Sequence, residues 1–432
     1  MAYAVVDTMM TGRASPADLA AMGLGASVYS SVFMSLTGVI SALNPIVAHH
    51  YGARRWGAIG PSYVQGLWLA LLLSLVGMPI LAFPRLWLTH IGAAPDVEAL
   101  VTQYLRLLSL ALPAALLFRA TYAFNVAVSR PKVMMTVQAA GLVLKVALNY
   151  ALIFGQFGLP RLGAVGCGLA SLIVHWALFA LGWAYTHLDP AYRRFAIGAD
   201  RPRWVALKEH LQLGVPIGLA YALESTSFSF VTVLIARLGT HVTGGHQIVS
   251  NVAALSFQIP LALSLATATL TAHALGAGDP ALARRTGFTG IRVAMTVAAL
   301  TAFACWTFRR GILGLYTDDV AVTSVALSLI GYFAAFHVFD ALQAITAFVL
   351  RAYKVTVVPT VIYAVALWGL GLVGGYALAF RPVLGGPRGA PGMWLMQSVA
   401  LGLTSCLLLA CYLWVLRQGR PVARSRVALT NG

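Results

Sequence analysis

Charged residues are scarce in this chain of 432 residues. They make up 9% of the sequence, whereas hydrophobic residues make up 59%. A soluble domain needs roughly 25% charged residues to cover its surface. The shortage excludes an ordinary soluble protein and predicts that most of the surface faces lipid. Many apolar runs are longer than about 18 residues, so each is long enough to cross a bilayer as a helix.

Acidic residues are scarcer than basic ones, 12 against 29, and the net charge is +17. On a soluble chain this excess would suggest nucleic acid as a partner. Here the Lys and Arg residues lie in short loops between apolar runs, so membrane topology explains them and we expect no nucleic-acid partner. One set of alternate loops, the set that includes the C-terminal tail, holds about twice as many as the other. We therefore predict a multi-pass protein of the cell (inner) membrane whose C-terminus is cytoplasmic.

Motifs for catalysis, ATP use and metal binding are also missing. The four cysteines, which lie in apolar segments and form no CxxC pair, are Cys167, Cys305, Cys406 and Cys411. This excludes a disulfide framework and a cysteine metal site. There is no GxxxxGK[ST] sequence, so ATP is not expected to drive this chain directly. We predict a protein that is not an enzyme and needs no cofactor.

The apolar runs predict an all-α integral membrane fold with about twelve transmembrane helices. Their predicted ranges are 1–11, 18–47, 57–83, 99–127, 132–155, 164–187, 209–237, 242–273, 282–308, 322–350, 355–380 and 392–416. The first run covers about 16 Å as a helix, half a bilayer. We therefore expect Met1 to lie in mid-helix and the first helix to be truncated.

The two halves of the chain repeat one another. Shifted by 224 residues, AHHYGA (48–53) falls on AHALGA (272–277), and further on a shift of 228 pairs Pro131 with Pro359. Six spans in each repeat predict two pseudo-symmetric bundles, with a substrate site between them. The predicted parts are an N-terminal lobe (1–187), a cytoplasmic connector (188–208), a C-terminal lobe (209–416) and a cytoplasmic tail (417–432).

Three acidic residues, Asp7, Glu224 and Asp340, lie deep inside the predicted spans, whereas the other nine fall in loops or at span ends. A charge at the bilayer centre costs about 2.5–3.5 kcal/mol on insertion scales, so such residues usually line a cavity or a pathway. A buried carboxylate suits the reversible binding of a proton or of Na+. The alternative is a structural role, in which a protonated acid forms a hydrogen bond between helices.

Polar side chains lie one helical turn from each of these acids, on the same helix face. They are candidates for lining a cavity or contacting substrate: Tyr3 near Asp7, Tyr221 and Ser227 near Glu224, and His337 and Gln343 near Asp340. For His337 two interpretations stay open. It shares a proton with Asp340, or it is a packing histidine.

Lys145 is a deep cation in the first half of the chain, and Asn149 follows it by one turn. Both are further cavity candidates. A buried lysine needs a carboxylate partner or loses its charge. Our hypothesis is an ion pair between Lys145 and Asp7. The alternative is that the lysine extends along its helix to reach the membrane interface.

Several segments resemble the multidrug and toxic compound extrusion (MATE) family, in its NorM-like branch. They include VDTMMTGRASPADLAAMGLG (6–25), NPIVAHHYGA (44–53), GVPIGLAYALE (214–224) and FDALQAITAFVLRAYK (339–354). They come in family order and cover nearly the whole chain.

The resemblance implies twelve helices in two bundles and export of cationic amphipathic compounds in exchange for Na+ or H+. It implies ion coupling by Asp7, Glu224 and Asp340, the last two being Na+ candidates. The chain departs from the family at Lys145, where many members carry Asn, and this puts a Na+ site at Asp7 in doubt.

We therefore predict a secondary antiporter that works by alternating access, as a monomer in the lipid bilayer. One alternative is a lipid-linked oligosaccharide flippase of the same superfamily, which should show a strongly cationic cavity. Another is a membrane-embedded enzyme, for which the sequence offers no motif.

Overall fold

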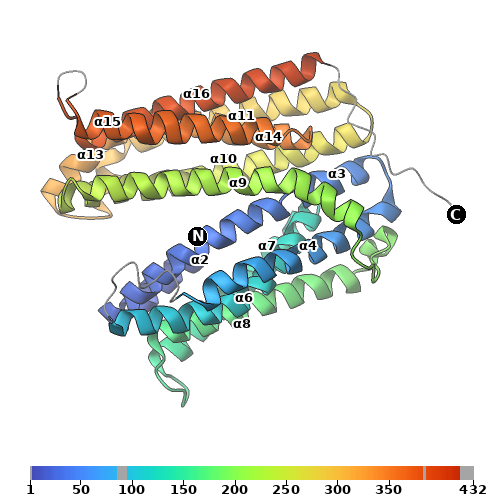
Figure 1. Cartoon of the computed structure of the whole chain (residues 1–432), viewed down its shortest axis with the longest axis horizontal. Helices are drawn as coiled ribbons and strands as arrows, with labels where there is room; N and C mark the ends of the chain where they lie inside the picture. The colour runs from blue at the N-terminus through green and yellow to red at the C-terminus, as the bar shows by residue number, and fades with distance from the viewer. Residues whose placement is uncertain (1, 85–94, 383–385, 419–432) are drawn as a thin grey trace. The chain divides into compact units, whose positions relative to one another are not determined.

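The computed structural model describes residues 2–84, 95–382 and 386–418, and within these ranges every regular element is helical (Figure 1). The predicted all-α fold is confirmed. The helices of the first half are α1 (Ala2–Gly12), α2 (Pro16–Ile40), α3 (Leu43–Gly52), α4 (Trp56–Ala82), α6 (Pro95–Ala127), α7 (Pro131–Phe154) and α8 (Gly163–Leu188). The short helix η1 (Pro190–Phe195) leads to α9 (Trp204–Ala236), which is followed by α10 (Thr240–Gly276), α11 (Pro280–Thr307), α12 (Arg309–Gly314), α13 (Val320–Ala352), α14 (Val357–Tyr363), the π-helical η2 (Ala364–Gly374), α15 (Gly375–Phe380) and α16 (Gly389–Arg417).

Eleven helical segments of the described chain are long and apolar enough to cross a membrane. With the shorter α1 they match the twelve predicted spans to within a few residues. The chain is therefore a multi-pass membrane protein. Most of the predicted cytoplasmic tail, 417–432, lies outside the described residues.

Local sequence explains where many of these helices begin. Short polar side chains cap exposed backbone N–H groups at helix N-termini. The Oγ of Ser15 accepts from the N–H of Asp18 before α2, at 3.0 Å. Asp279 caps α11 in the same way, and Asp319 caps α13. Pro16, which follows Ser15, suits a first helical turn because its missing N–H would have no partner there.

The predicted span 18–47 is divided into α2 and α3 by a break at Ser41 and Ala42. Pro45 accounts for this break. Its nitrogen has no hydrogen to donate to the carbonyl of Ser41, and its ring crowds that carbonyl. The corresponding helix of the second half, α10, continues without interruption.

The chain divides into two compact units, Met1–Gly218 and Leu219–Gly432. The boundary lies inside α9, so the connector 188–208 belongs to the first unit by its contacts. Tyr192 of η1 is buried, and its hydroxyl donates to the Asn125 side chain. Arg130 forms an ion pair with Asp189 at 2.7 Å. Whether the lobes move as 1–187 and 209–416 stays a prediction.

The internal repeat is visible in the backbone of the two units. α3 ends with the N–H groups of residues 53, 54 and 55 donating to the carbonyls of residues 49, 51 and 50. α10 ends with the same pattern, displaced by 224 residues, at residues 277, 278 and 279. In both turns the middle residue, Arg54 or Gly278, has a positive φ. The match AHHYGA to AHALGA therefore marks equivalent helix ends.

Later in the repeat the structural shift is 226 residues. Gly163 and Gly389, which begin α8 and α16, both have positive φ. The residue before each donates its N–H to an equivalent carbonyl, Leu162 to Leu152 and Arg388 to Leu378. The predicted shift of 228, based on pairing Pro131 with Pro359, is therefore wrong by two. Proline is tolerated at several positions of a first helical turn, so it does not fix the register.

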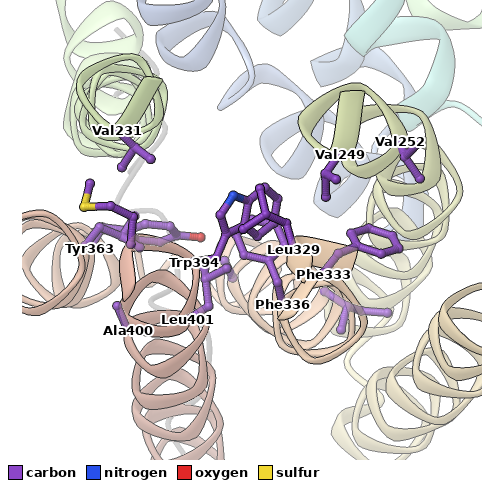
Figure 2. Close-up of a cluster of buried hydrophobic side chains, with 14 of the residues drawn as sticks. Val231, Val249, Val252, Leu329, Phe333, Phe336, Tyr363, Trp394, Ala400 and Leu401 are labelled. Atoms are coloured by element: carbon purple, nitrogen blue, oxygen red, sulfur yellow. The ribbon is translucent and has the colours of Figure 1, made fainter. Parts of the chain in front are cut away.

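The core of the second unit draws buried side chains from every helix between α9 and α16. Figure 2 shows Trp394 of α16 beside Phe336 and Leu329 of α13, with Val249 and Val252 on α10. Trp394 also donates its indole N–H to Nδ1 of the buried His246, at 3.1 Å. This packing holds α13, which carries Asp340, against its neighbours.

Candidate functional site

The first unit contains a buried ion pair. The ammonium of Lys145 lies 3.0 Å from Oδ1 of Asp7, and the lysine is 1% exposed. The amide of Asn149 donates to the same carboxylate oxygen at 2.7 Å. The pair suggested by the sequence is therefore present, and the lysine does not extend to the membrane interface.

Two further oxygens surround the ammonium. Lys145 donates to Oγ of Ser171 at 2.6 Å and to the carbonyl of Cys167 at 3.2 Å. Ser171 in turn donates to the Cys167 carbonyl at 2.9 Å. An ammonium has three N–H donors, so the carboxylate, the hydroxyl and the carbonyl satisfy all of them. We call these three oxygens the ammonium cage.

Helix geometry explains how the cage forms. Lys145 and Asn149 lie one turn apart on α7, and Cys167 and Ser171 lie one turn apart on α8, so each pair shares a helix face. The two helices pack against each other, and α1 packs on both. Asp7 therefore reaches both pairs.

Tyr3, the other α1 candidate, is directed elsewhere. Its hydroxyl donates to the backbone carbonyl of Gln138 at 2.8 Å. It therefore anchors α1 to α7 by a contact separate from the cage.

The second unit arranges its acids differently. Gln343 of α13 donates its side-chain amide to Oε1 of Glu224 on α9, at 3.2 Å. Asp340 is 7% exposed and accepts no hydrogen bond within the described chain. The two acids lie within range of each other's charge, and Glu224 also lies within range of the buried Arg351 guanidinium. Neither acid forms an ion pair with any described residue.

Three neighbouring candidates have distinct environments. The hydroxyl of Ser227 is buried and has no hydrogen-bond partner among the described residues. Tyr221 accepts from the guanidinium of Arg351 at 2.9 Å. The ring of His337 stacks on Phe333 at 5.5 Å, and its Nε2 has no partner in the described part of the chain. His337 is thus packed as a core residue and is not hydrogen-bonded to Asp340.

The sequence did not single out three contributors to these sites. Ser171 and the Cys167 carbonyl complete the ammonium cage, and their spacing of four residues was the available signal. Arg351 is buried, with its guanidinium carbon 4.2 Å from the ring centroid of Phe348. A cation in the last turn of a helix, three residues after an aromatic one, was the signal there.

The two sites differ in what they can bind. The first already neutralises its carboxylate with a fixed ammonium. The second offers two carboxylates and Oε1 of Gln343, which has no hydrogen-bond partner in the described ranges. No cluster of three or more His, Cys, Asp or Glu side chains able to hold a metal occurs in the described ranges. Na+ binding by Glu224 and Asp340 stays a prediction.

Comparison with known proteins identifies the family to which this chain belongs. The family model described as MatE matches residues 1–151 and 216–377. The chain is 41% identical over 422 residues to the "Probable multidrug resistance protein NorM" of Aromatoleum aromaticum, covering 96% of this chain and 90% of that protein. It is 35% identical over 417 residues to the "Multidrug resistance protein PmpM" of Pseudomonas aeruginosa, covering 95% and 86%.

Solved structures agree with this assignment at the level of the fold. The crystal structure of the eukaryotic MATE transporter AtDTX14 superimposes with a TM-score of 0.86 at 20% identity, covering 97% of this chain and 93% of that one. The fold of two pseudo-symmetric bundles is confirmed. The chain belongs to the MatE family of membrane transporters and is not an enzyme.

Proposed function

We propose that this protein is a multidrug efflux antiporter that exports cationic amphipathic compounds in exchange for Na+ or H+. Its relatives bear the name multidrug resistance protein, which supports export of small molecules. The ion exchange itself is our inference from the second unit. We further propose that it works in the cell inner membrane with the C-terminus in the cytoplasm.

The observation that carries this proposal is the pair Glu224 and Asp340. Both lie on membrane-spanning helices, and neither has an ion-pair partner in the described chain. A carboxylate that is removed from water and forms no ion pair favours taking up a proton or a metal cation. A positively charged substrate and the driving ion then compete for the same negative charge, and this competition couples their movements.

Gln343 supports this role by holding Glu224. Its amide N–H group binds Oε1 of the carboxylate. Asp340 lies one turn from Gln343 on α13, and the pairing of α13 with α9 therefore brings the two acids together.

The test is efflux of a cationic dye from liposomes that contain the purified protein, under an imposed Na+ or H+ gradient. We expect Glu224→Gln and Asp340→Asn each to abolish gradient-driven efflux while leaving membrane expression intact. Ser229→Ala serves as the matched control, because this exposed residue of α9 only donates to a backbone carbonyl of its own helix. Full gradient-driven efflux in both acid variants would refute the proposal.

A further inference from the structure

We propose that Lys145 is a tethered cation. Its ammonium occupies a cation-binding cage in the first unit, and it thereby withholds Asp7 from exchange with ions from solution. This inference rests on the proposed function, in which exchange takes place at Glu224 and Asp340. Its consequence is that one unit binds a fixed cation and the other a mobile one.

The saturation of the ammonium is the first argument. Its three oxygen partners lie at 3.0, 2.6 and 3.2 Å, and each comes from a different residue. A carboxylate, a hydroxyl and a backbone carbonyl are also the oxygen types that bind hard metal cations. A Na+ ion arriving from solution would have to displace a charge that is covalently attached beside it.

Unused oxygens around the cage are the second argument. Oδ1 of Asn149 and Oγ1 of Thr11 are buried and have no hydrogen-bond partner among the described residues. Asn149 binds Asp7 through its amide nitrogen, and Thr11 follows Asp7 by one turn of α1. Without the ammonium, the three cage oxygens would lose their common partner, and Asn149 and Thr11 carry two further oxygens that no described residue engages.

The internal repeat gives the third argument. With the shift of 226, Lys145 corresponds to Gly371, and Ser171 corresponds to Gln397. A Cβ placed on Gly371 would lie 3.1 Å from Oε1 of Gln397, so the equivalent helices also approach closely there. The side-chain nitrogen and oxygen of Gln397 are both buried, and neither has a hydrogen-bond partner in the described chain. The equivalent helices of the second unit thus approach each other without a cation at either of these two positions. The repeated fold therefore does not require one, and the positive charge at the equivalent place in the first unit comes from Lys145.

The experiment measures saturable binding of radioactive Na+ to the purified full chain in a Glu224→Gln, Asp340→Asn background, which silences the second unit. We expect no saturable binding in this background. Adding Lys145→Ala should create saturable Na+ binding and a rise in melting temperature with NaCl but not with choline chloride. Further addition of Asp7→Asn should abolish both.

Lys145→Met is the matched control. It removes the charge as Ala does, but its side chain still fills the cage, so we expect no Na+ binding. Asp7-dependent Na+ binding in the background with Lys145 intact would overturn the inference, and this result does not depend on whether the alanine variant folds. A folded Lys145→Ala variant that binds no Na+ would overturn it as well. Efflux by the Glu224→Gln and Asp340→Asn variants is measured separately, so failure of the proposed function is distinguished from failure of this inference.

Discussion

In the first unit, Asp7 lies 3.0 Å from an ammonium, whereas in the second unit neither Glu224 nor Asp340 forms an ion pair with a described residue. The backbones of the two units repeat, down to the hydrogen bonds that end α3 and α10. The difference shows that a duplicated fold fixes where helices meet but leaves the charge at each meeting point free to change. We expect the acid of the first unit to act mainly on stability and the acids of the second unit mainly on transport.

The largest expected effect on stability comes from Asp7→Asn. This change leaves the buried ammonium of Lys145 without its charge partner. Breaking a buried ion pair by removing one member typically costs about 3–5 kcal/mol. Asp340→Asn removes no ion pair, and we expect it to change stability by less than about 1 kcal/mol. Thermal unfolding of the purified variants in detergent measures both.

The double variant Asp7→Asn, Lys145→Met provides the control for that prediction. It removes the whole ion pair, so it should recover much of the stability that Asp7→Asn loses. Strictly additive losses would show that the two residues do not act as a pair.

Glycines at the start of α8 and α16 test the backbone repeat. A Cβ on Gly166 would lie 2.6 Å from the carbonyl oxygen of Leu152, and a Cβ on the equivalent Gly392 would lie 3.1 Å from that of Leu378. We expect Gly166→Ala to destabilise the protein by about 1–3 kcal/mol and Gly392→Ala by less. Equal melting temperatures for the two variants would contradict the geometry.

Gln343→Leu tests the second unit by removing the hydrogen bond to Glu224 and keeping a similar volume. A hydrogen bond to a charged group contributes about 1.5–3 kcal/mol and favours the ionised carboxylate, so without it we expect the apparent affinity for a driving proton to rise about tenfold or more. Ser171→Ala is the counterpart in the first unit and should leave this affinity unchanged. The concentration dependence of ion-driven dye efflux measures both.

The smallest effect concerns pH and the connector. The backbone N–H of Ala191, together with the Arg130 guanidinium, holds the pKa of Asp189 below its ordinary value. A depressed pKa in the folded state means that this carboxylate stabilises the fold above its unfolded pKa of about 4. The contribution is lost as the pH falls through the lower folded value.

Asp189→Ala should therefore lower the melting temperature at pH 7 and have a smaller effect at pH 3. Asp319, which accepts from the N–H groups of Val322 and Ala321, also has a lowered pKa. Asp319→Ala should show the same trend in the second unit. A melting-temperature difference that grows toward low pH would contradict the assignment.

Much of this fold could be predicted from the sequence. Apolar runs located the helices to within a few residues, because each helix must span the same thickness of hydrocarbon. The three acids and the pairing of Lys145 with Asp7 could also be predicted. A charge inside an apolar span is costly, so the few that occur there are expected to be paired or functional.

Other features depended on the packing of helices that are distant in the sequence. The cage oxygens of Ser171 and Cys167 are an ordinary hydroxyl and a backbone carbonyl, and neither stands out in a sequence. The repeat shift of 226 is fixed by turn hydrogen bonds and positive φ angles, which residue matches do not show. The contact of Arg351 with Tyr221 depends on how α13 meets α9.

The central claim is that the mobile cation belongs to the second unit. The most direct test compares gradient-driven dye efflux in liposomes between Asp7→Asn, Lys145→Met and Glu224→Gln, Asp340→Asn. We predict that efflux by the first double variant still depends on the imposed ion gradient, and that the second double variant shows no gradient-driven efflux. Gradient dependence that disappears in the first and persists in the second would contradict the account.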